Sequence, residues 1–238
     1  MTGRFELVES VTDAFAELAA GLLAAPREGR FSLCLSGGPT AKEAYRRLAE
    51  RTGAGGEKAV DWTTVDVYLG DERCVPPDHA DSNHKMITEV LLDQVGPVGS
   101  DHPMYRSGPP ADAAAAYQAE IEPLGAFDLV HLGLGPDGHC ASLFPDSPAL
   151  ACSDPDVLVM DNRDPHGNNP HDRITLTLPG IARSRLVVFT VSGESKRPAL
   201  ARIRAGTDLP AARVTATEVR WLVDAAAAGD TDLGDRRR

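Results

Sequence analysis

The sequence predicts an α/β fold: a single domain with a mostly parallel, doubly wound sheet and helices on both faces. Apolar runs of strand length alternate with segments of helical periodicity along the chain, which is typical of this class. The clearest strand, residues 128–134, is a nearly continuous apolar run, as expected of a parallel strand covered on both faces. With 238 residues the chain can form one substantial core and need not be divided.

The elements of the first quarter follow from caps and stop signals. A helix capped by Ser10 is predicted through about Ala25, because apolar residues recur at helical spacing and Pro26 stops it. A short strand at 31–35 then ends in the glycine turn SGGPT, and Pro39 suits the first turn of the helix that follows. This segment therefore predicts a strand, turn and helix unit.

The next unit has the same order. A strand is predicted at 65–69, and charged residues 71–73 come directly after it. Ser82 or Asn83 can cap a helix that continues to about Leu92. The second half predicts helices at 111–122 and after Ser195, a polar loop at 161–172, and further strands at 157–160, 174–178, 186–191 and 220–223. Residues from 225 are too polar and short to assign, and we expect a disordered tail from about residue 229.

Composition excludes several classes of protein. The net charge of −11 disfavours binding to nucleic acid or acidic membranes, which requires clustered Lys and Arg. The start of the chain does not resemble a signal peptide, and no segment is long and apolar enough to span a bilayer. The cysteines lack CxxC or zinc-type spacing, which favours a reduced environment: Cys34, Cys74, Cys140 and Cys152. We expect a cytoplasmic protein, monomeric or at most a weak dimer.

Four unusual loops follow predicted strands: SGGPT, GDER, GLGPDGH and SGESK. The carboxyl ends of the strands form the binding edge of such sheets, so these loops are expected to meet in one crevice. Glycine turns at helix N-termini present free backbone N–H groups to anions, as Gly37, Gly38 and Thr40 would do here. Arg173 and Lys196 lie at strand boundaries from which they could reach the same anion. The alternatives are a plain tight connection and ordinary surface charges.

The segment GLGPDGH is the strongest candidate for chemistry. It contains Asp137 and His139, and histidine has the side-chain pKa nearest neutrality. Its glycines also match the GxGxxG dinucleotide pattern, but Pro145 follows too soon for the helix that this pattern requires. Cys140 beside His139 is not expected to be a nucleophile, because adjacent residues rarely have the necessary geometry.

Other charged groups have a structural and a functional interpretation. Asp71, Glu72 and Arg73 follow a buried strand, where they either serve a ligand or form an internal salt bridge. A metal site could be suggested by four residues, but their spacing fits no familiar set of ligands: Asp78, His79, Asp81 and His84. We therefore expect no metal. His166 and His171 fall in the polar loop, which we expect to be mobile.

Five motifs in order resemble the 6-phosphogluconolactonase family: LSGGPT, GDERCVPPDHADSN, FDLVHLGLGPDGHCASLFP, RITLTLP and VSGESK. The resemblance spans about residues 31–224, and the similarity is weaker in the segment WLVDAAAA. It implies one α/β domain related to aminosugar-phosphate deaminases, no cofactor, and hydrolysis of 6-phospho-D-glucono-1,5-lactone in the oxidative pentose phosphate pathway. By motif position, the resemblance implies that the substrate phosphate is held by Gly37, Gly38, Thr40, Arg173 and Lys196. The residues that it implies around the sugar ring are Asp71, Arg73, Asn83, Asp137 and His139. Pro39 and Ala41 depart from the commoner SGGSTP form, so no hydroxyl at position 39 can contact the phosphate.

The implied mechanism needs one base that also serves as acid. His139 would deprotonate water and then protonate the leaving ring oxygen, with Asp137 in support and Arg73 or backbone N–H groups stabilising the oxyanion. The related deaminases carry a glutamate five residues beyond the histidine, where this chain has Phe144. A deaminase is thereby disfavoured. A sugar-phosphate sensor without catalysis is a further alternative, against which the retention of both Asp137 and His139 argues.

Overall fold

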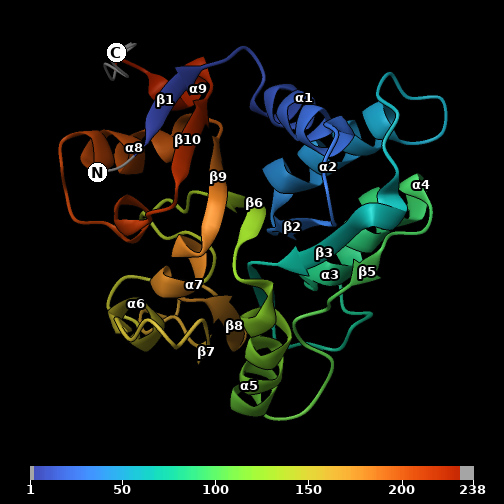
Figure 1. Ribbon diagram of the computed structural model, residues 1–238. Helices are drawn as coiled ribbons and strands as arrows, with labels where there is room; N and C mark the ends of the chain where they lie inside the picture. Colours follow the sequence, from blue (N-terminus) through green and yellow to red (C-terminus); the bar gives the residue numbers. More distant parts are fainter. Residues whose placement is uncertain (1–2, 231–238) are drawn as a thin grey trace.

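The computed structural model describes residues 3–230, and they form an α/β domain (Figure 1). The seven strands of the main sheet are all parallel and lie in the order β1-β10-β9-β6-β2-β3-β5. A second sheet of three antiparallel strands has the order β4-β8-β7. The strands are β1 (Arg4–Leu7), β2 (Phe31–Leu35), β3 (Val65–Leu69), β4 (Asp71–Arg73), β5 (Ser100–Asp101), β6 (Phe127–Gly133), β7 (Val159–Asn162), β8 (Arg173–Leu176), β9 (Ser184–Val191) and β10 (Glu218–Val223).

The main helices follow the predicted units closely. Ser10 caps α1, its hydroxyl accepting the Asp13 N–H at 3.2 Å, and Pro39 opens α2. Ser82 rather than Asn83 caps the segment formed by α3, a π-helical turn at Thr88–Leu92, and α4. The helices are α1 (Val11–Ala24), α2 (Pro39–Thr52), α3 (Asn83–Ile87), α4 (Asp93–Val95), α5 (Pro110–Ile121), α6 (Pro148–Ala151), α7 (Leu178–Ala182), α8 (Arg197–Arg204) and α9 (Ala225–Ala228).

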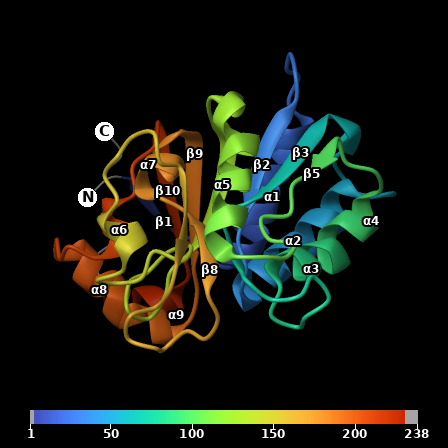
Figure 2. The ribbon, with the colours of Figure 1, turned by 90° about the horizontal axis from the view of Figure 1, so that it is seen from below.

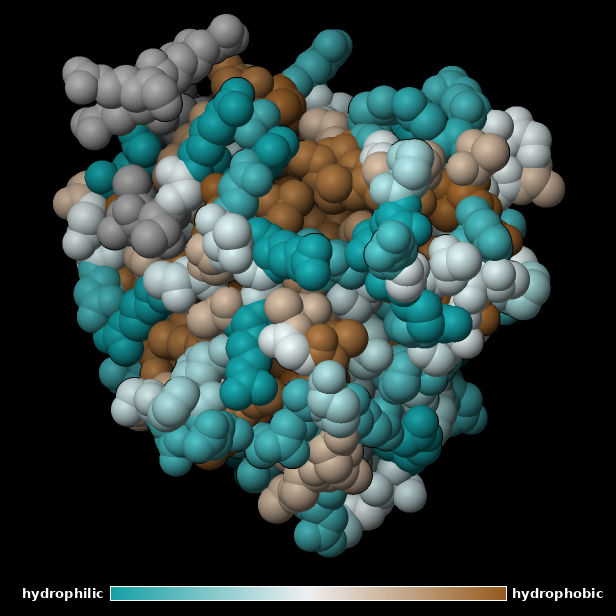
Figure 3. All heavy atoms as spheres, in the orientation of Figure 1, coloured by the Kyte–Doolittle hydropathy of each residue, from teal (hydrophilic) through white to brown (hydrophobic). Residues whose placement is uncertain are grey.

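The core lies on both faces of the main sheet. Every residue of β2 and β3 is buried, and apart from Ser32 and Asp66 these residues are apolar or aromatic, as expected of strands covered on both faces. Helices α1 and α2 pack against each other on one side, and α5 lies with the small sheet on the other (Figures 1 and 2). The face in Figure 3 is mostly hydrophilic, with smaller apolar areas between the polar side chains. Among the described residues, Leu7 is the exposed large hydrophobic side chain.

Several features differ from the sequence-based expectation, and the short elements β5, α6 and α7 were not predicted. β1 was not predicted, because its four residues bury only Phe5 and show no usable periodicity. Residues 71–73 form β4 rather than a loop, and 174–178 belongs with β4 in the small sheet rather than the main one. The polar loop is shorter than predicted, since 161 and 162 end β7. The tail from 229 falls largely outside the described residues, and no described helix is long and apolar enough to cross a bilayer.

The strand order reverses direction beside β2. From β2 the chain moves outward through β3 and β5, then returns to β6 on the other side of β2 and continues outward to β9 and β10. The connections that leave the carboxyl ends of β2 and β6 therefore diverge to opposite sides. Open α/β sheets bind their ligands in the crevice that such a divergence leaves.

The N-cap of α1 gives a test of the local structure. Replacing Ser10 with Ala removes the hydroxyl that accepts the Asp13 N–H, so the free energy of unfolding is expected to fall by about 1 kcal/mol. Urea unfolding measures this change. Ser10→Thr keeps the hydroxyl and is the matched control; equal losses in both variants would contradict the capping role.

Candidate active site

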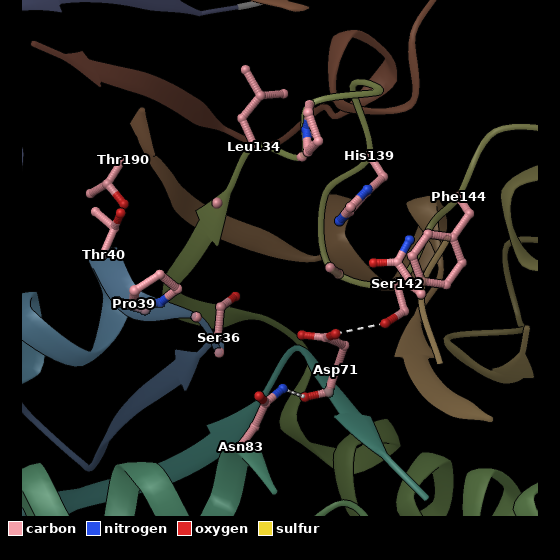
Figure 4. A pocket seen from close by; sticks show the side chains of 18 of the residues that line it. Ser36, Pro39, Thr40, Asp71, Asn83, Leu134, His139, Ser142, Phe144 and Thr190 are labelled. Carbon is pink, nitrogen blue, oxygen red and sulfur yellow. Dashed lines mark hydrogen bonds between the residues drawn. The ribbon is translucent and has the colours of Figure 1, made fainter. Parts of the chain in front are cut away.

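A cleft of about 220 Å³ opens at the carboxyl ends of β2 and β6, where the strand order reverses. Residues from all four predicted loops line it, so the expected convergence is confirmed. Figure 4 shows side chains from the turn after β2, from β4 and from the GLGPDGH loop directed into the same space. Of the ten predicted site residues, nine line this cleft: Gly37, Gly38, Thr40, Asp71, Arg73, Asn83, His139, Arg173 and Lys196.

The glycine turn after β2 forms one end of the cleft. α2 begins at Pro39 directly after Gly38, so the first N–H groups of this helix face the cleft without intrahelical partners. Gly37 is required by close approach: a Cβ there would lie 1.8 Å from Asn83 Oδ1. The turn and the start of α3 therefore fit together only with glycine at this position.

Arg173 and Lys196 bring two partly desolvated cations to this cleft. Arg173 is only 5% exposed, and its Nε and Nη1 have no hydrogen-bond partner among the described residues. Burial lowers the pKa of Arg173, although the nearby charge of Asp71 opposes that shift. Burial also lowers the pKa of Lys196, against the charge of Asp137. A buried cation without a partner, as Arg173 is here, is unfavourable, so the cleft suits an anion.

His139 projects into the cleft and Asp137 lies behind it. Asp137 Oδ1 is 2.6 Å from His139 Nδ1 and also accepts the His139 backbone N–H at 3.1 Å. Burial alone would raise the pKa of Asp137, but the hydrogen bonds and charge of His139 outweigh it, so the pKa lies below its ordinary value. The carboxylate stays ionised and orients the imidazole, leaving Nε2 for a ligand. Gly135 allows this orientation, because a Cβ there would lie 2.2 Å from Nδ1.

The three charged residues after β3 do not form a salt bridge, so that interpretation of them is wrong. None of Asp71, Glu72 and Arg73 forms an ion pair with another described residue. Glu72 is buried and accepts the N–H groups of Asn83 and His84 at 2.7 and 2.8 Å. Burial raises its pKa, and these backbone hydrogen bonds oppose the shift. Glu72 thus anchors the start of α3, while its two neighbours face the cleft.

Asp71 belongs to a network that lines the middle of the cleft. Its Oδ2 accepts the Ser142 hydroxyl at 2.6 Å, and its backbone carbonyl accepts Asn83 Nδ2 at 2.8 Å (Figure 4). Arg73 Nη1 donates to Asn83 Oδ1 at 2.7 Å and to the Asp81 carbonyl at 2.8 Å. These contacts fix four polar side chains in the cleft, and they pair neither Asp71 nor Arg73 with an opposite charge.

Several cleft residues were missed by the sequence analysis. Ser142 follows Ala141, whose φ of 47° is unusual for a residue with a side chain. Asn169 reaches the cleft from the polar loop, where it is held by Asp164 through bonds of 3.0 Å to its N–H and 2.8 Å to its Nδ2. Thr190 sits at the end of β9. Only Ser142 stood within a quoted motif; the other two gave no local signal.

The remaining candidates lie outside this site or are chemically unsuited to it. Burial raises the pKa of the Cys140 thiol far above its usual range, which disfavours a nucleophilic thiolate. His166 and His171 do not line the cleft; they lie 3.0 Å from Asp146 and 2.9 Å from Asp81. Within residues 3–230 no group of three or more His, Cys, Asp or Glu side chains is arranged to hold a metal ion.

Known proteins match both the sequence and the fold. The family model described as glucosamine-6-phosphate isomerases/6-phosphogluconolactonase matches residues 3–223. The 6-phosphogluconolactonase of Synechocystis sp. is 42% identical over 185 residues, 74% of this chain and 72% of the relative. That of Nostoc sp. is 37% identical over 222 residues, 87% of each chain. The crystal structure of 6-phosphogluconolactonase from Thermotoga maritima has a TM-score of 0.80 and 32% identity, covering 94% of this chain and 100% of that chain.

The fold and the cleft define an α/β protein whose binding site lies where the strand order reverses and contains an oriented histidine and two cations. The chain belongs to the glucosamine-6-phosphate isomerase/6-phosphogluconolactonase family. A monomeric glucosamine-6-phosphate deaminase shares its fold, with a TM-score of 0.77 at 18% identity.

The Asp137–His139 pair predicts a pH dependence of stability. The pKa of Asp137 is lowered from 3.8 in the native state, so between these two pKa values the native protein binds fewer protons than the unfolded chain. The stabilisation is thus present above about pH 5 and lost as the pH falls through the native pKa. When the pH is lowered from 5 to 3, the free energy of unfolding should fall less in Asp137→Asn than in the native chain. Urea unfolding at both pH values measures the difference.

The exposed Asp112 on α5 provides the control, as Asp112→Asn. If Asp137→Asn and Asp112→Asn have the same pH dependence as the native chain, the interaction assigned to Asp137 is wrong.

Proposed function

We propose that this chain is a 6-phosphogluconolactonase that hydrolyses 6-phospho-D-glucono-1,5-lactone to 6-phospho-D-gluconate in the oxidative pentose phosphate pathway. The observation that carries the proposal is one cleft that holds an oriented histidine and two cations, of which Arg173 has two unpaired nitrogens. The names of the relatives support the same reaction. We expect no cofactor, because a lactone carbonyl is electrophilic enough to be attacked by an activated water.

The phosphate is proposed to lie at the Arg173 end of the cleft. The free N–H groups at the start of α2, with Gly37, Gly38 and Thr40, would donate to its oxygens. The unpaired Nε and Nη1 of Arg173 and the ammonium of Lys196 would supply charge-assisted hydrogen bonds. Pro39 contributes no hydroxyl here, so the anion depends on backbone donors and cations.

His139 is proposed as the general base and then the general acid. Its Nδ1 is held by Asp137, so Nε2 would take a proton from water as the oxygen attacks the lactone carbonyl. Collapse of the tetrahedral intermediate breaks the bond to the ring oxygen, to which the same Nε2 returns the proton. Asp137 remains ionised and stabilises the imidazolium that forms between the two steps. Its position behind His139 fits this supporting role.

The middle of the cleft would hold the sugar ring. Asp71 and Asn83 are fixed by Ser142 and Arg73 and would bind the ring hydroxyls. Arg73 is the proposed oxyanion donor, alongside backbone N–H groups, because its guanidinium is held in the cleft through Nη1. The position five residues beyond His139 is Phe144, whose ring lies 5.1 Å from the imidazole and cannot move a proton. This contact disfavours the deaminase alternative.

The first test is hydrolysis of fresh 6-phosphogluconolactone with the spontaneous rate subtracted. His139→Gln is expected to lower kcat by about 10²–10⁴-fold, the usual contribution of a general acid–base group. His166→Gln, a histidine outside the cleft, is the control and should retain native activity. Undiminished turnover by His139→Gln would remove the base assignment. Tight binding of 6-phosphogluconate without any turnover by the native chain would favour the sensor.

The second test uses the unpaired charge of Arg173. Arg173→Met keeps an unbranched side chain but removes the guanidinium donors, so KM for the phosphorylated lactone should rise about 10–100-fold. The same change removes a buried cation without a protein partner, so the ligand-free variant should unfold at higher urea concentration. Arg185→Met, an exposed site on β9, is the control for both measurements. A variant with native KM would contradict the phosphate site.

A further inference from the structure

A chain of buried polar side chains runs beneath the glycine turn. Tyr45 Oη accepts the Ser36 N–H at 2.8 Å and lies 2.8 Å from His131 Nδ1. His131 Nε2 lies 2.9 Å from Thr190 Oγ1. The Tyr45 and His131 side chains are fully buried, and Phe15 stacks on the imidazole at 4.0 Å between ring centroids. Ser36 and Thr190 both line the cleft in which the phosphate is proposed to bind, so both ends of this chain of side chains reach the cleft.

The sheet register explains how His131 meets Thr190. Gly133 of β6 lies opposite Thr190 of β9, and His131 lies two residues before Gly133 on the same face of the sheet. Gly133 has no side chain to fill the space above Thr190. The Thr190 side chain is 4% exposed, borders the cleft, and lies well apart from His139 in Figure 4.

His131 is neutral, because burial lowers its pKa to about 3. One ring nitrogen therefore carries a proton and the other accepts one. If Nδ1 carries it, Nδ1–H donates to Tyr45, the Tyr45 hydroxyl donates to the Ser36 carbonyl at 3.1 Å, and the Thr190 hydroxyl donates to Nε2. In that state Thr190 can only accept a hydrogen bond from a ligand.

If Nε2 carries the proton, the direction of the chain is reversed. Nε2–H then donates to Thr190 Oγ1, and the Tyr45 hydroxyl donates to Nδ1. The Thr190 hydroxyl hydrogen has no protein acceptor among the described residues and is free for the cleft. Both states hold the same protons, one on the ring and one on each hydroxyl. They differ only in whether Thr190 offers the cleft a donor.

We propose that Thr190 is a further hydrogen-bond donor for the phosphate group, and that buried His131 and Tyr45 are positioning residues that turn its hydroxyl toward the anion. This rests on the phosphate site of the proposed function. The oxygens of a phosphate dianion only accept hydrogen bonds, so the bound anion selects the state in which Nε2 of His131 is protonated. The Ser36 N–H stays paired with Tyr45 in both states, which keeps the glycine turn in place.

The decisive measurement is the tautomer of His131 by ¹⁵N NMR in histidine-labelled native enzyme saturated with 6-phosphogluconate. A proton on Nε2 is expected, and a proton on Nδ1 would overturn the proposal. A purely structural role for His131 does not require this tautomer to follow the ligand. The same spectrum with unphosphorylated gluconate shows whether the phosphate group is what selects the state.

Kinetics of Thr190 variants test the donor itself. Thr190→Val should raise KM for the phosphorylated lactone about tenfold with kcat within about twofold, and Thr190→Ser should restore KM. Thr52→Val removes another buried hydroxyl, which donates to the Leu48 carbonyl at 2.7 Å, and should leave KM unchanged. Native KM in Thr190→Val, in a chain whose native form is active, would overturn this proposal alone. A native chain without lactonase activity would overturn the proposed function instead.

Discussion

The pairing of β2 with β6 is the constraint on which the site depends. These strands are neighbours in the sheet, yet the chain leaves them toward opposite sides, so the loops at their carboxyl ends diverge and leave a cleft. The β2 turn carries the proposed anion donors and the β6 loop carries His139, so one strand pair sets the distance between the proposed anion site and the proposed base. The small sheet then adds Asp71, Arg73 and Arg173 from the side, because β4 and β8 pair directly in register.

The site is assembled from groups that would be unfavourable in an ordinary core. Arg173 is buried with two unpaired nitrogens, and Ala141 has a left-handed backbone conformation beside Ser142. Their neighbours are correspondingly well satisfied. Glu72 binds two backbone N–H groups of α3, and His131 has a partner on each ring nitrogen. The unpaired nitrogens of Arg173 therefore give the cleft hydrogen-bonding capacity that a charged ligand could use.

Much of this arrangement could be predicted from the sequence. Buried parallel strands have continuous apolar sequences, and glycine turns followed by helices have recognisable caps, so β2, β3, β6 and β9 were found with small errors in their ends. β1 and β4 were missed, because short or charged strands are defined by partners more than 90 residues away. Thr190 and Asn169 were missed for the same reason. A threonine in an apolar strand and an asparagine in a polar loop are ordinary until the fold places them beside one cleft.

The position of β1 at the edge of the main sheet has a consequence for how the chain is made. Its only strand partner in the described residues is β10, which ends at Val223, so β1 is synthesised long before the strand with which it pairs. The glycine turn after β2 likewise emerges long before Arg173 and Lys196, the cations that share its cleft. A nascent chain released near residue 170 would thus display an incomplete cleft and an unpaired β1. Such contacts between distant parts of a sequence slow folding and prolong exposure of strand edges.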